Sequence, residues 1–296
     1  MKILVIGSKG FIGSHVQQYL HVQGYEVWGA DVVVDYTADR YLLIDASNEQ
    51  FKGLFGAHQF DACINCGGAA SVAASVTQPQ RDYYLNVKLV FDVLEAIRTE
   101  KPTCKFIQLS SAAVYGNPTT LPIAENAAAQ PISPYGWHKY QSELLCKEFA
   151  QLYQVPTIAL RIFSAYGPGL KKQLLWDWFQ KARLHDTVAV FGSGEESRDF
   201  IYITDLVAVI ALALQKAAFD GSTVNVANGT AWYIKDAAAL FFGYLQQPYH
   251  FMGTTQAGDP INWQASIHTI QQWGYQPQVS IPQGFQQYIA WAKEFR

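Results

Sequence analysis

Short apolar strands that alternate with amphipathic helices most strongly constrain how this chain folds. Strands are predicted at 2–6, 25–30, 40–44, 61–65, 105–109 and 157–163. Helices are predicted between them at 11–22, 81–99 and 135–153. Chains with this alternation form a parallel sheet with helices on both faces. We therefore expect an α/β fold with a doubly wound parallel sheet.

Three evenly spaced glycines, Gly7, Gly10 and Gly13, separate the first predicted strand from the first predicted helix. Glycines at such a junction let backbone N–H groups approach a pyrophosphate, and the helix N-terminus favours its negative charge. The spacing is G-x-x-G-x-x-G, and an ordinary glycine turn is the alternative interpretation. In this context the loop predicts a Rossmann-type fold that binds a dinucleotide.

An acidic residue, Asp31, follows the second predicted strand, where a carboxylate can bind the adenosine ribose. Such a carboxylate accepts hydrogen bonds from the ribose hydroxyls and repels a 2′-phosphate, so it favours NAD over NADP. Lys9, within the glycine loop, could attract a phosphate and so favours NADP. Asp31 could also be a simple turn residue.

The pattern changes after residue 166, where Gly167-Pro168-Gly169 interrupts the chain. A helix is predicted at 174–184, a short strand at 188–191, and a helix at 204–214 capped by Thr204 or Asp205. We expect a dinucleotide-binding domain formed by 1–165 and 200–228. A smaller C-terminal substrate-binding lobe would comprise 166–199 and 229–296.

A tyrosine and a lysine, Tyr135 and Lys139, are four residues apart at the start of a predicted helix and share one face. A neighbouring ammonium should lower the pKa of the phenol. The phenolate could then accept a proton from a substrate hydroxyl as hydride leaves carbon. Ser111, at the end of a predicted strand, could orient the reacting oxygen. The alternative is a surface Tyr–Lys pair.

With the glycine loop, Asp31, the Ser110-Ser111 strand end and Y-x-x-x-K in this order, the chain resembles the extended short-chain dehydrogenase/reductases. Within them it resembles the NAD-dependent epimerase/dehydratase family, which acts on nucleotide sugars. The resemblance extends nearly end to end, through IDA (44–46), NCGGAA (65–70), SSAAVYG (110–116) and RDFIYITD (198–205). It implies NAD as cofactor, a nucleotide-diphosphate sugar as substrate, and often a homodimer formed through the helices at about 81–99 and 134–153.

The resemblance also assigns site residues. It implies that the catalytic residues are Ser111, Tyr135 and Lys139. The residues that it implies for cofactor binding are Gly7, Gly10, Phe11, Ile12, Gly13, Asp31, Asp45, Ala46, Gly67, Gly68, Asn86, Ser110, Tyr135, Lys139 and Phe163. Those implied for substrate binding are Ser71, Ser111, Tyr135, Ser164 and Arg198, with the Arg198 guanidinium on the diphosphate.

Three departures from the family pattern bear on the reaction. Ala112 and Ala113 replace the Asp-Glu pair of the dehydratases, so dehydration is not expected. Ser164 replaces a usual asparagine. QAGD (256–259) lacks the second diphosphate arginine, which Lys171 or Lys172 could replace.

Our leading hypothesis is a nucleotide-sugar epimerase acting at C4 through a transient 4-keto sugar. The first alternative is a 4-keto-deoxysugar nucleotide reductase that uses NAD(P)H and the same residues once. The second is a non-catalytic dinucleotide-binding scaffold.

Composition excludes other classes of partner. A net charge of −3 and a pI of about 6.1 argue against nucleic acid and against a polybasic membrane anchor. No apolar run has the length of a membrane span, and the opening MKILVIG lacks a cleavage pattern, so we expect a cytoplasmic protein. Cys63 and Cys66 are expected to be buried thiols, His15 and His138 to be structural, and no metal site is expected.

Overall fold

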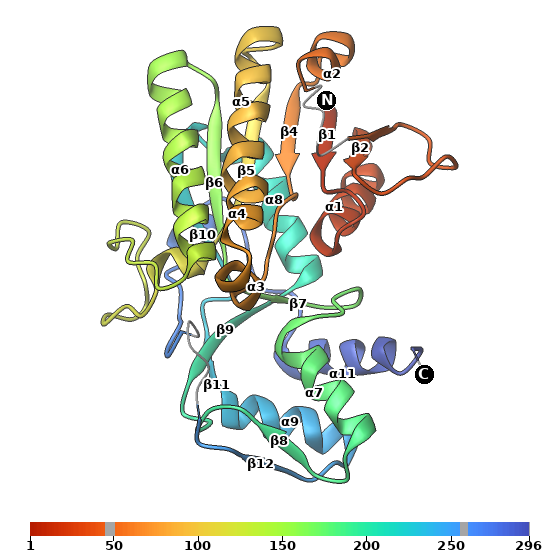
Figure 1. The fold of residues 1–296 in the computed structure, drawn as a ribbon, viewed down its shortest axis with the longest axis vertical. Helices are drawn as coiled ribbons and strands as arrows, with labels where there is room; N and C mark the ends of the chain where they lie inside the picture. The colour runs from red at the N-terminus through yellow and green to blue at the C-terminus, as the bar shows by residue number, and fades with distance from the viewer. Residues whose placement is uncertain (45–50, 255–259, 296) are drawn as a thin grey trace.

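A seven-stranded sheet forms the centre of the computed structural model, which describes residues 1–44, 51–254 and 260–295 (Figure 1). Its strand order is β10-β6-β5-β4-β1-β2-β3, and every neighbouring pair is parallel. The bounds are β1 Lys2–Ile6, β2 Glu26–Asp31, β3 Tyr41–Leu43, β4 Ala62–Asn65, β5 Lys105–Ser111, β6 Thr157–Ile162 and β10 Asp220–Val226. The order reverses between β1 and β4. Ligands bind at such a switch point, outside the carboxyl ends of the strands.

Helices cover both faces of this sheet because successive side chains of its strands point to opposite sides. Ile3 and Val5 of β1 share one core cluster with side chains of α1 (Phe11–Val22) and α8 (Ile203–Lys216). Leu4 and Ile6 pack instead with α2 (Phe51–His58), α5 (Leu89–Glu100) and α6 (Pro134–Tyr153). The prediction of a Rossmann-type, doubly wound sheet is confirmed.

The helix predicted at 81–99 is in fact three segments. α4 (Pro79–Tyr83) leads into a π-helical segment, η1 (Tyr84–Lys88), which continues as α5. The wider π turn shifts the direction in which the following side chains point. Such turns occur often at functional sites, and this one carries Asn86.

A smaller lobe lies beyond the carboxyl ends of β1 and β4 (Figure 1). It contains a three-stranded sheet of β11 (Ala231–Tyr233), β9 (Ser197–Tyr202) and β7 (Ser164–Tyr166), and a pair formed by β8 (Val188–Val190) and β12 (Tyr249–Phe251). Its helices are α7 Gln173–Leu184, α9 Ile234–Leu245 and α11 Ile281–Ala292, whereas α10 His268–Gln272 contacts β10 of the central sheet. None of the helices in the described ranges combines the length and the hydrophobicity that a membrane span requires.

The predicted cap of α8 is wrong. The helix begins at Ile203, and the residue before it, Tyr202, makes no capping bond through its side chain. Asp205 lies inside the first turn, where its Oδ2 accepts hydrogen bonds from the backbone N–H groups of Gln278 and Val279. This carboxylate therefore ties the C-terminal segment to α8 and caps nothing.

Candidate active site

Two glycines of the loop, Gly7 and Gly13, leave no room for a side chain. A Cβ atom on Gly7, whose φ is +74°, would lie 2.6 Å from the backbone nitrogen of Gly67, and one on Gly13 would lie 2.1 Å from the Gly7 oxygen. Gly10 precedes α1 without a capping side chain, and α1 then begins with Phe11 and Ile12. The first N–H groups of this helix are consequently available to an anion, as a pyrophosphate site requires.

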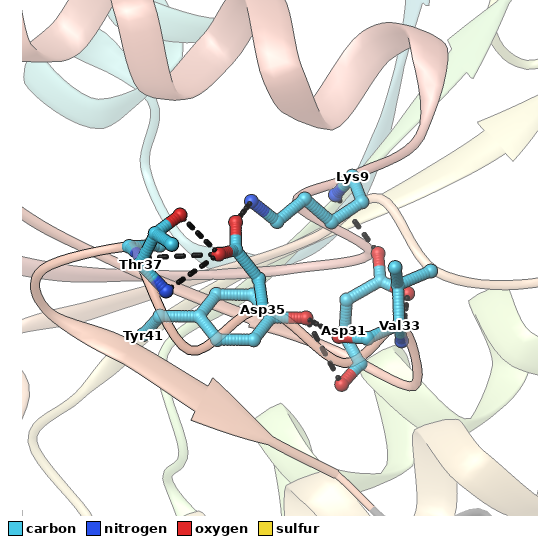
Figure 2. A network of polar contacts seen from close by, with 7 residues as sticks. Lys9, Asp31, Val33, Asp35, Thr37 and Tyr41 are labelled. Atoms are coloured by element: carbon cyan, nitrogen blue, oxygen red, sulfur yellow. Dashed lines mark hydrogen bonds and ion pairs between the residues drawn. The ribbon is translucent and has the colours of Figure 1, made fainter.

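Asp31 stands at the end of β2, beside this loop (Figure 2). Its Oδ2 accepts a hydrogen bond of 2.8 Å from the backbone nitrogen of Lys9, and its Oδ1 accepts one of 2.8 Å from Val32. The Lys9 ammonium is paired with the carboxylate of Asp35. Asp45 and Ala46, which were also predicted to bind cofactor, lie outside the described residues.

The segment after β4 brings Gly68, Asn86 and Lys139 together. A Cβ on Gly68 would lie 2.6 Å from Oδ1 of Asn86 and 3.5 Å from Nζ of Lys139, and Gly67 donates its N–H to Asn65 Oδ1 at 3.1 Å. Asn86 is buried, and neither polar atom of its amide has a hydrogen-bond partner among the described residues. Buried amides are almost always paired, so this one fits a polar ligand such as the ribose of a dinucleotide. The glycine cradle and this amide together fit NAD.

Ser111, Tyr135 and Lys139 meet at the carboxyl end of β5. Ser111 ends that strand, and Tyr135 lies in the first turn of α6, where its backbone N–H donates to Ser75 Oγ at 3.1 Å. Lys139 is one turn further along α6. Its ammonium donates to the Leu109 carbonyl at 3.0 Å and lies 5.9 Å from the centre of the Tyr135 ring.

The pKa of Tyr135 is raised and not lowered, contrary to the expectation from spacing. Burial raises the pKa of the phenol to about 12, against the smaller effect of a hydrogen bond with Ser111, which lowers it. Burial also lowers the pKa of Lys139 to about 8, while the nearby Asp82 carboxylate raises it. Desolvation outweighs the pairwise attraction that spacing suggests, so the phenol holds its proton at neutral pH.

The residues predicted to bind substrate lie in several separate elements and do not form one cluster as Ser111, Tyr135 and Lys139 do. Ser164 on β7 pairs with Phe200 on β9, two positions beyond Arg198. The Arg198 guanidinium donates to the Ser197 carbonyl at 2.9 Å and lies 5.7 Å from the Trp263 ring.

Trp263 is a neighbour that the sequence analysis did not identify. Its ring lies 5.9 Å from that of Phe163, centre to centre, so it links Arg198 to a predicted cofactor residue. A tryptophan in the irregular tail carried no signal of this contact.

Two predicted site serines use their side chains within the protein. Ser71 accepts a hydrogen bond from the Ala74 N–H and so caps α3 (Val72–Thr77). Ser110 donates its hydroxyl to Glu143 at 2.6 Å and is buried. Their predicted contacts with substrate and cofactor stay predictions.

A buried Asp–His pair adjoins the predicted catalytic residues. Nδ1 of His138 lies 2.6 Å from Oδ2 of Asp82, and both side chains are largely buried. His138 stands between Tyr135 and Lys139 on α6, whereas Asp82 belongs to α4, immediately before the π turn. The pair therefore joins α4 to the helix that carries Tyr135. Sequence spacing gave no sign of this carboxylate, because the two residues are 56 positions apart.

The four cysteines are free thiols, and the prediction that the C-x-x-C pair is buried is confirmed for Cys63 but not for Cys66. Cys63 is buried in β4, Cys66 is half-buried just after it, and burial raises the pKa of Cys66 to about 12. Across the described ranges, no group of three or more His, Cys, Asp or Glu side chains could hold a metal ion.

A Rossmann-type sheet with a glycine cradle at its first β–α junction, and with Ser, Tyr and Lys at the end of β5, defines a dinucleotide-dependent protein of the short-chain dehydrogenase/reductase type. The model of the NAD dependent epimerase/dehydratase family matches residues 3–227. The chain belongs to this family.

Similar proteins span nearly the whole chain. It is 30% identical to an uncharacterized UDP-glucose epimerase of Bacillus subtilis, with 98% of each chain covered. It is 28% identical to a probable UDP-glucuronate 4-epimerase of Rhizobium meliloti, covering 98% of this chain and 96% of the relative. The crystal structure of the UDP-glucuronic acid 4-epimerase of Bacillus cereus, with UDP-glucuronic acid and NAD, superposes with a TM-score of 0.90 at 27% identity and full coverage of both chains.

Proposed function

We propose that this protein is an NAD-dependent nucleotide-sugar epimerase that inverts C4 of a UDP-sugar through a transient 4-keto sugar. One observation carries the proposal: the half-buried Tyr135 side chain lies beside Ser111 and Lys139 at the carboxyl end of β5, on the same edge of the sheet as the glycine cradle. The relatives named above, an uncharacterized UDP-glucose epimerase, a probable UDP-glucuronate 4-epimerase and a UDP-glucuronic acid 4-epimerase, support the substrate class.

The side chains divide the work at one sugar hydroxyl. When bound, NAD supplies reversible hydride transfer. Tyr135 takes the proton from the 4-hydroxyl and later returns it, while Ser111 holds the reacting oxygen by a hydrogen bond. Because the phenol holds its proton in the protein alone, added positive charge at the site is needed to favour its ionised form. Lys139 supplies part of that charge and binds the nicotinamide ribose.

The remaining assignments belong to the same proposal. Gly67, Gly68 and Asn86 line the nicotinamide end of the cofactor site, and Asp31 binds the adenosine ribose. Ser71, Ser164 and Arg198 bind substrate. The dinucleotide-binding domain comprises 1–165 and 200–228, and the substrate lobe comprises 166–199 and 229–296, so that β7 and β9 of the smaller sheet cross the boundary between the two. Neither Ala112 nor Ala113 has a side chain that can act as an acid or a base, which argues against dehydration.

The test is incubation of the purified protein with UDP-glucose, UDP-glucuronate or UDP-N-acetylglucosamine carrying deuterium at C4, without added cofactor. We expect the C4 epimer of one of them to accumulate to equilibrium with its deuterium retained, as shown by NMR. Retention follows because the hydride leaves and returns within one site. A product formed only with stoichiometric NADH or NADPH would identify the reductase instead.

We also propose a homodimer that pairs α5 and α6 of two copies. Large apolar side chains on these helices are exposed: Phe91, Trp137, Leu144, Leu152 and Tyr153. Large apolar side chains left exposed on two adjacent helices favour an interface. Sedimentation at micromolar concentration should give about twice the chain mass of 33.0 kDa, and a Leu144→Glu variant should sediment as a monomer. A monomeric parent protein would contradict the proposal.

We further propose a cytoplasmic location, in keeping with four unpaired thiols.

A further inference from the structure

Lys9 occupies a place in the glycine loop where a cation could bind a phosphate. Its backbone N–H donates to Oδ2 of Asp31 at 2.8 Å, so its side chain starts beside the carboxylate to which we assign the adenosine ribose (Figure 2). A lysine ammonium is a compact charge on a flexible stem and binds phosphate groups readily. On this placement alone, the loop would accept a ribose that carries a 2′-phosphate.

The ammonium, however, is held by another residue. It forms an ion pair with Asp35 and lies 4.8 Å from the centre of the Tyr41 ring (Figure 2). The pair is only partly exposed, with 32% of the Lys9 side chain and 24% of the Asp35 side chain accessible. Water therefore screens the attraction between these two charges less than it screens a fully solvated surface pair.

Asp35 is itself held in position by the loop that follows. Its Oδ1 accepts hydrogen bonds from the Thr37 backbone N–H at 2.9 Å, the Thr37 hydroxyl at 2.7 Å and the Ala38 N–H at 3.1 Å. Tyr41, whose ring lies under the ammonium, donates its hydroxyl to the Val33 carbonyl. Hydrogen bonds from Lys9 and Thr37 also keep the pKa of Asp35 well below its usual value, so the carboxylate stays charged.

We propose that Asp35 is a cofactor-specificity residue that holds the Lys9 ammonium away from the ribose 2′ position and adds a second negative charge beside Asp31. A 2′-phosphate brings nearly two negative charges. To bind it, the protein would have to break the Lys9–Asp35 pair while two carboxylates repel the ligand. NAD carries no such group and meets neither cost. The inference rests on the proposed cofactor site.

The test compares dissociation constants of NAD and NADP for the full chain, freed of bound nucleotide, by isothermal titration calorimetry. In Asp35→Asn the ammonium is released, and we expect NADP to bind roughly tenfold more tightly or better. The affinity for NAD should change less than about threefold, because the Asp31 carboxylate remains. The substitution keeps the shape of the side chain and its hydrogen bonds with Thr37.

Two controls isolate the cause. Asp39→Asn makes the same change in net charge on the same loop, where Asp39 accepts from the Arg40 N–H, and should leave both constants unchanged. Lys9→Met added to Asp35→Asn should abolish the gain, because the gain requires the ammonium. The proposal is overturned by an unchanged NADP-to-NAD ratio in Asp35→Asn, by a gain that survives Lys9→Met, or by a parallel loss of NAD affinity. A parent protein that binds neither dinucleotide would overturn the proposed cofactor site as well, whereas one that binds NAD without epimerising any sugar would contradict only the proposed reaction.

Discussion

A Tyr135→Phe variant is expected to lose epimerase turnover by a factor on the order of 10² to 10⁴, the contribution typical of a positioned acid–base group. The substitution removes one oxygen and leaves the ring, so the packing of α6 on β5 should survive. The loss should appear in kcat, because the phenol acts on the reacting hydroxyl. The measurement is the rate of UDP-sugar epimerisation by NMR, with bound NAD and melting temperature recorded alongside.

Tyr140→Phe is the matched control, because Tyr140 is a half-buried phenol on the same helix to which we assign no chemistry. It should retain nearly full turnover. If Tyr135→Phe kept the activity of the parent protein, the proposed mechanism would be wrong. The scaffold interpretation would be supported if the parent protein performed no epimerisation and Tyr135→Phe left its biological activity unchanged.

The second large effect concerns stability. We expect Glu143→Ala to lower the free energy of unfolding by about 3–5 kcal/mol, as measured by urea denaturation. Glu143 Oε2 lies 2.7 Å from the Arg161 guanidinium, both side chains are at least 94% buried, and Ser110 donates to the other carboxylate oxygen. Removing Glu143 leaves the Arg161 charge buried, and among the described residues only the Tyr115 hydroxyl and the Glu125 carbonyl then accept hydrogen bonds from it.

An exposed ion pair of similar geometry supplies the control. Glu95 lies 2.7 Å from Arg98 on α5, and the two side chains are 27% and 37% exposed. Glu95→Ala should cost no more than about 1 kcal/mol, because water screens the pair and solvates the partner that remains. Equal losses for the two variants would mean that burial does not set the cost. Glu143 lies one turn beyond Lys139, so its loss should also disturb the active site.

Elements whose signal is local were predicted well. The bounds of β1 and α1, Lys2–Ile6 and Phe11–Val22, agree with prediction to the residue, because an apolar run and a 3.6-residue period are properties of the segment itself. Helix α2 was not predicted, and Gly53 and Gly56 within it lower helix propensity. The π turn at Tyr84–Lys88 was also missed, since no propensity distinguishes it from an α-helix.

Some features of the proposed site were likewise predictable from local sequence, and others were not. The order of glycine loop, Asp31, Ser111, Tyr135 and Lys139 was visible in the sequence because each residue lies at the end of a strand or the start of a helix. The Asp82–His138 pair, the contact of Trp263 with Phe163 and the capture of Lys9 by Asp35 were not visible. Each joins residues from two segments that lie far apart in the sequence, so no spacing rule reports them.

The sequence by itself therefore determined the α/β class, the succession of strands and helices, and the residue types that the chemistry requires, because these depend on local periodicity and motif order. Tertiary structure alone decided the electrostatic state of those residues. The pKa of Tyr135 rises to about 12 and that of Lys139 falls to about 8. The physical reason is desolvation: the free energy of a charge depends on how much water the whole fold removes from around it, and elements distant in sequence remove that water.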